Sequence, residues 1–138
     1  MSVPLAVPVQ GPVSMRVAFS GQSAAEVRYA LYRWLGYSGA GESVIDDALL
    51  VITELLGNAV RHATPLVDGT VLVRWCRDEA GLLLSVSDGG GRTAPALAGA
   101  EALEERGRGL ALVAALSLRW WVDSRMRAHT VHARLPLA

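Results

Sequence analysis

The sequence predicts an α+β two-layer sandwich, in which helices cover one face of a mixed, mainly antiparallel sheet. The expected elements follow the order strand, helix, helix, two strands, helix, two strands. The two strands of each consecutive pair are therefore joined without a helical crossover, which favours antiparallel pairing. The longest helical segment also carries a wide apolar face, which is typical of a helix that packs on a sheet. At 138 residues the chain has room for one domain with one hydrophobic core.

The first residues are expected to stay outside this domain. Residues 1–14 contain Pro4, Pro8 and Pro12, and proline disfavours both helix interiors and central strands. We therefore predict a flexible tail over residues 1–14 and one domain over residues 15–138.

The domain is predicted to open with a strand and a helix. Apolar and polar residues alternate over residues 15–19, which predicts a short strand. Apolar residues then recur at helical spacing over residues 23–36, and Gly36 ends the run. Ser23 and Glu26 have the spacing of a capping box, in which the serine side chain bonds the backbone of the first turn.

The second helix, over residues 42–63, is the strongest periodic segment of the chain. When residues are placed at steps of about 100°, one wide face is apolar. It contains Ile45, Ala48, Leu49, Ile52, Leu55, Leu56, Ala59 and Ala63. The narrower polar stripe on the other side contains Asp47, Glu54, Asn58, Arg61 and His62. The pattern predicts that the apolar face of this helix packs on the sheet and that the polar stripe points away from it.

Two hairpins are expected to complete the sheet. Residues 70–77 and 82–88 are predicted strands, joined by the glycine-containing connection D-E-A-G. The segments R-W-W-V-D-S-R and H-T-V-H-A-R-L-P predict a C-terminal hairpin around residues 126–128. Between the hairpins, residues 89–106 are expected to form a mobile connection, and the G-R-G of residues 107–109 opens a third helix.

Alternation within the C-terminal hairpin separates four large side chains. His129 and His132 lie three residues apart on one predicted strand, so they point to opposite faces and cannot jointly bind a metal. Trp120 and Trp121 also point to opposite sides. One tryptophan is therefore expected in the core, and the other on a candidate contact surface.

The composition excludes several kinds of chemistry. The chain contains no lysine, so all 13 basic residues are arginines. The missing amine excludes Schiff-base catalysis and the lysine of a G-x-x-x-x-G-K-[ST] phosphate loop. The 13 basic residues balance 13 acidic residues, and this zero net charge argues against direct nucleic-acid binding.

Other features of the sequence bear on location. Cys76 is the single cysteine, so no intramolecular disulfide forms, which fits a reducing compartment. No apolar run approaches the roughly 20 residues of a membrane span. The N-terminus also lacks the positive charge that opens a signal peptide. We therefore expect a cytoplasmic protein without a membrane partner.

Three local motifs carry the chemistry, and the first lies on the second predicted helix. Glu54, Asn58 and His62 recur at intervals of four residues, so the helix brings them to one face. A carboxylate beside an amide oxygen suits Mg²⁺, which prefers oxygen ligands and keeps waters and substrate phosphates. The alternative is a solvated polar stripe on an amphipathic helix.

The second motif, S-D-G-G-G, follows a predicted strand. Asp88 offers an acceptor for an amino group, and the glycines that follow let the backbone approach a flat ligand. The alternative is ordinary turn chemistry, because Asp-Gly-Gly is common in turns.

The third motif is the segment Gly107, Arg108, Gly109 and Leu110 at the start of the third predicted helix. Free backbone N–H groups and the positive end of the helix dipole favour a phosphate there. A lone G-x-G is unspecific by itself, and it is not a dinucleotide-binding loop because Leu112 stands where a third glycine would be.

Taken together and in this order, the three motifs resemble the boxes of the GHKL ATPase superfamily, whose nucleotide-binding Bergerat fold is an α/β sandwich. The matching positions are Glu54 and Asn58 for E-x-x-x-N, Asp88 and Gly90 for D-x-G-x-G, and Gly107 and Gly109 for G-x-G. Thr130 occupies the place of the threonine near the last strand of the family. The resemblance covers residues 15–137 and is closest to the single-domain anti-sigma-factor serine kinases of actinobacteria.

The resemblance implies ATP and Mg²⁺ as ligands. Asn58 would contact the Mg²⁺ that bridges the phosphates, and Glu54 would be the general base on a serine hydroxyl or on water. Asp88 would accept from the adenine amino group, while Gly90 would let the base approach.

The resemblance also assigns the remaining binding residues. Residues 92–106 would form the lid over ATP, and His62 would lie near the phosphates. Phosphate would be held by Gly107, Arg108, Gly109 and Leu110, and Thr130 would complete the nucleotide site. One position departs from the family pattern, because Arg92 stands where D-x-G-x-G has its second glycine. This departure puts lid closure and turnover in doubt.

The function expected from this resemblance is a Mg-ATP-binding anti-sigma factor. It would bind a sigma factor and, as a serine/threonine protein kinase, phosphorylate an anti-anti-sigma partner of the STAS type. The alternative, motivated by Arg92, is a nucleotide-gated interaction module without useful kinase activity. The catalytic piece of a histidine kinase fits less well, because no phosphoacceptor helix is present. The sequence leaves open whether the chain forms a homodimer.

Overall fold

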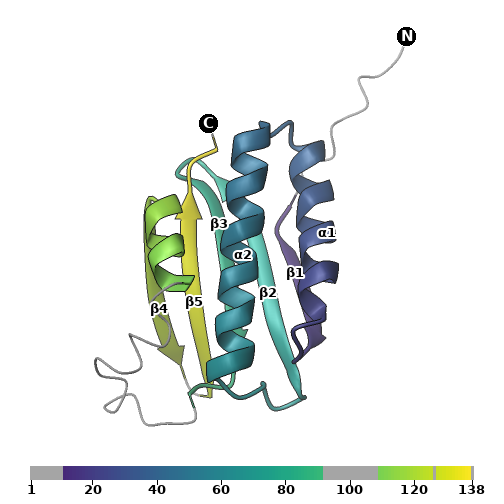
Figure 1. The fold of residues 1–138 in the computed structure, drawn as a ribbon, viewed down its shortest axis with the longest axis vertical. Helices are drawn as coiled ribbons and strands as arrows, with labels where there is room; N and C mark the ends of the chain where they lie inside the picture. Colours follow the sequence, from purple (N-terminus) through teal and green to yellow (C-terminus); the bar gives the residue numbers. More distant parts are fainter. Residues whose placement is uncertain (1–10, 92–108, 126, 138) are drawn as a thin grey trace.

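The computed structural model describes residues 11–91, 109–125 and 127–137. The elements follow the order β1 (Val13–Ala18), α1 (Ser23–Tyr37), α2 (Glu42–His62), β2 (Thr70–Asp78), β3 (Gly81–Asp88), β4 (Arg119–Arg125) and β5 (Ala128–Leu135) (Figure 1). Residues 109–116 form a further helix before β4. The predicted lid of residues 92–106, which includes Arg92, lies outside the described residues, and so do Gly107 and Arg108 of the third motif.

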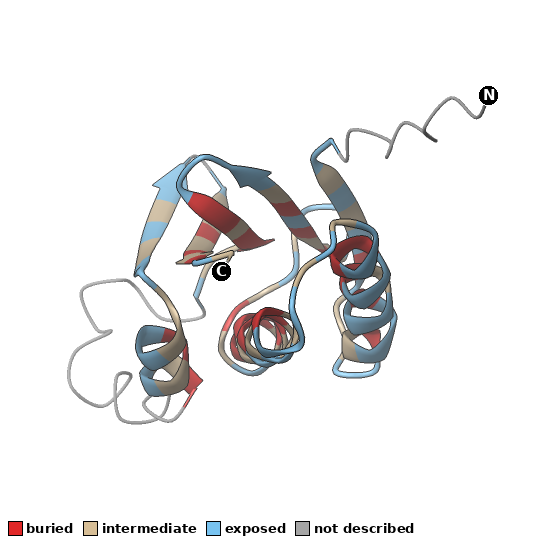
Figure 2. Ribbon diagram, turned by 90° about the horizontal axis from the view of Figure 1, so that it is seen from above, coloured by how far each residue is buried: buried red, intermediate tan, exposed pale blue. Residues whose placement is uncertain are grey.

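The five strands form one sheet in the order β1-β2-β3-β5-β4, and each pair of neighbours is antiparallel. The helices all lie on one side of this sheet, and α2 runs between α1 and the helix of residues 109–116 (Figure 2). The other face of the sheet, which we call the outer face, carries no helix within the described residues. The predicted α+β two-layer sandwich is therefore confirmed.

The hydrophobic core fills the space between the helices and the inner face of the sheet. Its largest fully buried side chains are Trp75, Leu31, Leu35, Ile52, Leu56, Leu82, Leu84 and Leu135. Trp120 packs against this core from β4, as expected for one of the two adjacent tryptophans. Because α2 is the middle helix, it is buried on a wider arc than its apolar periodicity predicts. Val44, Val51 and Asn58 are buried as well.

The predicted capping box at the start of α1 is wrong. The residue before the helix is Gln22, and no side chain caps the first turn. Ser23 is already the first helical residue, and its hydroxyl donates to the carbonyl oxygen of Ala18 at 2.7 Å. The serine therefore ties the helix to the end of β1, because that carbonyl lies where the strand has finished its pairing.

The hairpins form where the sequence predicts them. The register of β2 and β3 pairs Asp78 with Gly81, and that of β4 and β5 pairs Arg125 with Ala128. β1 begins at Val13, two residues before the predicted strand. None of the described helices is long and apolar enough to cross a membrane.

Candidate functional site

The first and third motifs meet at the C-terminal half of α2. A Cβ atom at Gly109 would lie 2.7 Å from Oε2 of Glu54 and 3.2 Å from Nδ2 of Asn58. The backbone at Gly109 therefore sits directly against both side chains, and a side chain at this position would displace the Glu54 carboxylate. The structure thus brings together two motifs that are about fifty residues apart in the sequence. The residue at the point of closest approach is a glycine, which has no side chain to obstruct the contact.

Asn58 is the most confined polar group of this region. The residue is 9% exposed, and its Oδ1 accepts from Nη2 of Arg61 at 3.3 Å. Its Nδ2 is buried and has no hydrogen-bond partner within the described residues. Buried polar groups without a partner are costly and uncommon in native proteins. The unmet hydrogen-bonding capacity of Asn58 therefore points to a ligand at this position.

The second motif is held beside the C-terminal end of α2 by the segment that follows the helix. The backbone N–H of Gly89 donates to the carbonyl of Thr64 at 2.8 Å, and the N–H of Thr64 donates to the carbonyl of Gly90 at 2.8 Å. A Cβ at Gly89 would collide with the carbonyl of Pro65. Gly89 is therefore required by this contact, which brings the end of β3 close to the end of α2.

Asp88 serves the turn with one of its oxygens. Its side chain is 5% exposed, and Oδ1 accepts from the backbone N–H of Gly90 at 2.7 Å. Oδ2 accepts no hydrogen bond from the described residues. Gly90 has φ +99°, and the space where its Cβ would stand is open. The carboxylate therefore closes a turn, as one interpretation of this motif expects, and its second oxygen stays a candidate acceptor for a ligand.

The neighbour of Asp88 on β5 is His129 rather than Thr130. Register pairs Asp88 with His129, and Nδ1 of His129 lies 3.7 Å from Oδ1 of Asp88. Thr130 pairs with Ser87 on the outer face, where the two hydroxyl oxygens are 2.7 Å apart. The structure therefore does not bring Thr130 to the other predicted site residues. The missed residue is His129, and the alternation of β5 could have found it, because Val131 points to the core.

The other predicted residues fall near the same place or outside the described part of the chain. His62 is the last residue of α2 and is partly buried, and Leu110 is partly buried in the helix of residues 109–116. Gly107 and Arg108 are not described. Among the predicted residues, the structure brings Gly109 against Glu54 and Asn58 on α2, and it places Asp88 and Gly90 close to the end of that helix.

The donor atoms near Glu54 fit a hard cation. The described residues contain no group of three or more His, Cys, Asp or Glu side chains that could hold a metal ion. The Asn58 amide oxygen would supply an oxygen ligand beside the Glu54 carboxylate, and the remaining positions would fall to water and phosphate. This is the coordination that Mg²⁺ prefers.

The outer face carries a polar network that resembles a catalytic triad. Nδ1 of His132 lies 2.7 Å from Oγ of Ser85, and Nε2 lies 3.1 Å from Oδ2 of Asp123. Burial lowers the pKa of His132, the hydrogen bond and charge of Asp123 oppose this shift, and the charge of Arg74 adds to it. Ser85 lies inside β3, where strand pairing on both sides engages the backbone N–H groups. The backbone N–H groups beside Ser85 are therefore not free to act as oxyanion donors, which favours a structural role for the network among the described residues.

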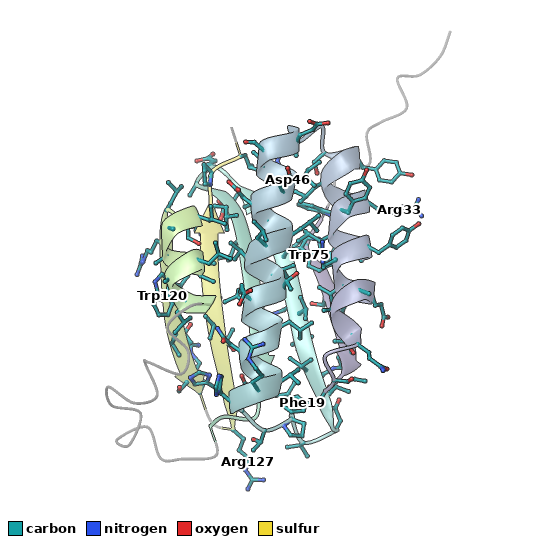
Figure 3. The ribbon with its side chains drawn as sticks, in the orientation of Figure 1. Phe19, Arg33, Asp46, Trp75, Trp120 and Arg127 are labelled. Atoms are coloured by element: carbon teal, nitrogen blue, oxygen red, sulfur yellow. The ribbon has the colours of Figure 1, made fainter. Side chains whose placement is uncertain are left out.

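A second exposed feature lies on the side of α1 that points away from α2. Tyr29, Tyr32 and Tyr37 are exposed. Arg33 lies between two of the phenols (Figure 3), and its guanidinium donates to Oη of Tyr29 at 3.4 Å and to Oη of Tyr37 at 3.3 Å. Arginine and tyrosine are enriched in protein interfaces. We call these residues the α1 tyrosine face.

The protein has an antiparallel sheet that is covered on one side by helices. A carboxylate, an amide and a glycine converge beside α2, an arrangement typical of one class of nucleotide-binding domains. A family model for the histidine kinase-like ATPase domain matches residues 18–134. The chain therefore belongs to this family, which confirms the resemblance to the GHKL ATPases. No curated protein matches the chain in sequence.

Solved structures with the same fold agree. The structure of the RsbU and RsbW domains of Rv1364c from Mycobacterium tuberculosis has a TM-score of 0.71 and 24% identity, covering 93% of this chain and 33% of that one. The structure of the SiaB-SiaC complex from Pseudomonas aeruginosa has a TM-score of 0.63 and 20% identity. The match covers 88% of this chain and 87% of that one. The structure of the histidine kinase AdeS from Acinetobacter baumannii has a TM-score of 0.51 and 12% identity. The match covers 91% of this chain and 68% of that one. The chain spans about a third of the Rv1364c structure, and these similarities show the fold alone.

Proposed function

We propose that the protein binds Mg-ATP and transfers its γ-phosphoryl group to a serine or threonine of a protein partner. In this proposal the protein is an anti-sigma factor, and its substrate is an anti-anti-sigma protein of the STAS type. The observation that carries the proposal is the meeting of Glu54 and Asn58 with the backbone at Gly109. It joins a carboxylate, a hard-oxygen ligand and the backbone of the helix of residues 109–116 in one place.

The described residues have distinct roles in this proposal. Asn58 binds the cation through its amide oxygen, while its unpartnered Nδ2 donates to a phosphate oxygen. Asp88 accepts from the 6-amino group of the purine through its free Oδ2. Mg²⁺, when bound, supplies positive charge against the phosphates. Phosphoryl transfer depends mostly on positioning and charge stabilisation, which agrees with a chain that has no lysine.

Glu54 is the proposed general base. Its carboxylate accepts the hydroxyl proton of the partner while the hydroxyl oxygen bonds to the γ-phosphorus. The bond from that phosphorus to the oxygen bridging to the β-phosphate breaks, and ADP leaves with the electron pair. A positioned base of this kind contributes about 10²- to 10⁴-fold to the rate.

The test compares Glu54→Gln with Asn58→Ala. Glu54→Gln is expected to keep Mg-ATP binding, measured by calorimetry, and to lose about 10²-fold or more of the phosphotransfer. Asn58→Ala is expected to weaken both. Asp47→Asn is the matched control, since it changes a carboxylate of the same polar stripe two turns away. The partner is obtained by pull-down with and without Mg-ATP, and its phosphosite is mapped. Equal transfer by Glu54→Gln and the wild type would refute the base assignment, and absence of Mg-dependent ATP binding would refute the whole proposal.

A second candidate function is a nucleotide-gated interaction module without phosphotransfer. Two observations favour it: Arg92 replaces a family glycine, and Oε2 of Glu54 is already packed against Gly109. In this case ATP would act through its different affinity for two states of the protein. Phosphoserine or phosphothreonine on a partner that the protein binds would eliminate this candidate.

The α1 tyrosine face supports a protein partner in either case. Its side chains are large, rigid and exposed, and Arg33 is oriented by two phenols before any partner arrives. Preorganisation of this kind lowers the entropic cost of binding. A retained partner complex with Arg33→Ala would show that the partner binds elsewhere.

A further inference from the structure

His129 holds a position in the site that the family motifs do not assign. It lies on β5 directly across from Asp88, on the helix side of the sheet, and its side chain is 25% exposed. The imidazole therefore borders both the buried carboxylate and solvent. Nδ1 is 3.7 Å from Oδ1 of Asp88, which is a close contact without a hydrogen bond.

The two oxygens of Asp88 are unequally engaged. Oδ1 is held by the backbone N–H of Gly90 and faced by His129. Oδ2 accepts no hydrogen bond from the described residues, and the space above Gly90 is open. A flat base that enters this space meets Oδ2 of Asp88, whose other oxygen faces the imidazole of His129.

This pair of groups matches one purine edge better than another. Adenine presents an amino donor at position 6 beside an acceptor at ring nitrogen N1. Hypoxanthine presents the reverse order, with an acceptor at position 6 and a donor at N1. A carboxylate only accepts, whereas a histidine ring N–H donates. Asp88 and His129 therefore fit adenine without a shift of the base.

We propose that His129 is a specificity-determining residue of the nucleotide site, which donates a ring N–H to N1 of adenine while Asp88 accepts from the 6-amino group. This inference rests on the proposed nucleotide binding and adds the reading of the base. A site built to hydrogen-bond a substrate N–H rejects analogues that lack it, because its own polar groups are left unpaired. The selectivity between ATP and ITP, whose base is hypoxanthine, is thus the property that His129 controls.

The experiment measures dissociation constants of Mg-ATP and Mg-ITP by calorimetry for the full chain and three variants. In His129→Ala, affinity for Mg-ATP is expected to fall about 5- to 10-fold while affinity for Mg-ITP stays the same, so the preference for ATP shrinks by that factor. His129→Asn keeps a side-chain N–H donor and is expected to restore part of the preference. His132→Ala is the matched control, a histidine on the same strand and the opposite face, and it should leave the ratio unchanged. Melting curves establish that each variant is folded.

The outcomes separate this inference from the function on which it rests. Equal weakening of both nucleotides in His129→Ala would show a merely structural role and overturn the inference. An unchanged ratio in His129→Ala and His129→Asn, with clear ATP binding by the wild type, would also overturn it while leaving the proposed function intact. A wild-type protein that binds neither nucleotide would overturn both.

Discussion

His129 and His132 lie three residues apart on β5, yet the two faces of the sheet treat them differently. On the outer face, both ring nitrogens of His132 have partners: Nδ1 lies 2.7 Å from Oγ of Ser85, and Nε2 lies 3.1 Å from Oδ2 of Asp123. The imidazole also stacks on Trp121, with 5.0 Å between the ring centroids. On the helix side, His129 lies 3.7 Å from Asp88 and has no hydrogen bond to the described residues. Both histidines have a carboxylate neighbour, but the polar groups around His132 satisfy one another.

The same contrast extends along the two faces. Ser87 and Thr130 pair their buried hydroxyls across the outer face. On the helix side, Nδ2 of Asn58 is buried without a partner among the described residues, and one oxygen of Asp88 is unused there. A network that completes itself stabilises the fold, whereas one with unmet capacity indicates a ligand site. The comparison therefore predicts that helix-side substitutions change binding, and that outer-face substitutions change stability.

The largest expected effect comes from Asp88→Asn. An asparagine oxygen can still accept from the N–H of Gly90, so the turn at the end of β3 should survive. The negative charge that receives the purine amino group is lost, and Mg-ATP affinity should fall about 10- to 100-fold. Calorimetry measures this fall, and a melting curve measures the stability. Loss of stability without loss of affinity would place Asp88 with the structural groups and break the comparison.

An intermediate effect is expected from Gly109→Ala. The new methyl group would stand 2.7 Å from Oε2 of Glu54, so the flexible carboxylate must move. Alanine favours a helix by up to about 1 kcal/mol over glycine, so stability should be kept or increased. Phosphotransfer should fall about tenfold, because the base is displaced from its position.

Gly36→Ala is the matched control for this substitution. It is also a helical glycine, in α1, but a Cβ there meets nothing within 4 Å. Phosphotransfer should be unchanged in that variant. If both variants transferred phosphate at the wild-type rate, the contact between Gly109 and Glu54 would have no role in the reaction.

The features that the sequence predicts correctly are those that depend on residues close together in the chain. The i, i+4 spacing of Glu54 and Asn58 places them on one helix face in any context, and the apolar period of α2 predicts its burial. The hairpins follow from short connections. The sequence nonetheless allows Asn58 to lie in a solvated stripe, because its burial depends on the helices on either side of α2.

The missed features depend on contacts between distant segments. Ser23 has the spacing of a cap, but its hydroxyl bonds the Ala18 carbonyl at the end of β1. Thr130 is expected in the site, whereas the β3 and β5 register places His129 beside Asp88. The approach of Gly109 to Glu54 depends on helix packing, about which a G-x-G spacing says nothing. Both errors amount to one residue. The helix begins one residue earlier relative to Ser23 than the capping box requires, and the strand register places the residue before Thr130 opposite Asp88.

The smallest expected effect concerns the pH dependence of stability. The folded protein lowers the pKa of His132 below its ordinary value of 6.5, chiefly by burial, against the opposing carboxylate of Asp123. The unfolded chain therefore binds the proton more readily. This contribution to stability is fully present above about pH 6.5 and is lost as the pH falls toward the folded pKa. The contribution to stability should be small because the hydrogen bond and charge of Asp123 oppose the effect of burial.

The measurement is the melting temperature of the ligand-free protein between about pH 7.5 and 5.5, for the wild type and for His132→Asn. The wild type should lose a few degrees more on acidification than the variant, since the asparagine that replaces His132 carries no titrating ring. Because the two proteins differ only at residue 132, the difference between the curves isolates the contribution of His132. Parallel curves would mean that the folded protein accepts the proton on His132 as easily as the unfolded chain does, and the outer-face network would then not be self-sufficient in its neutral form.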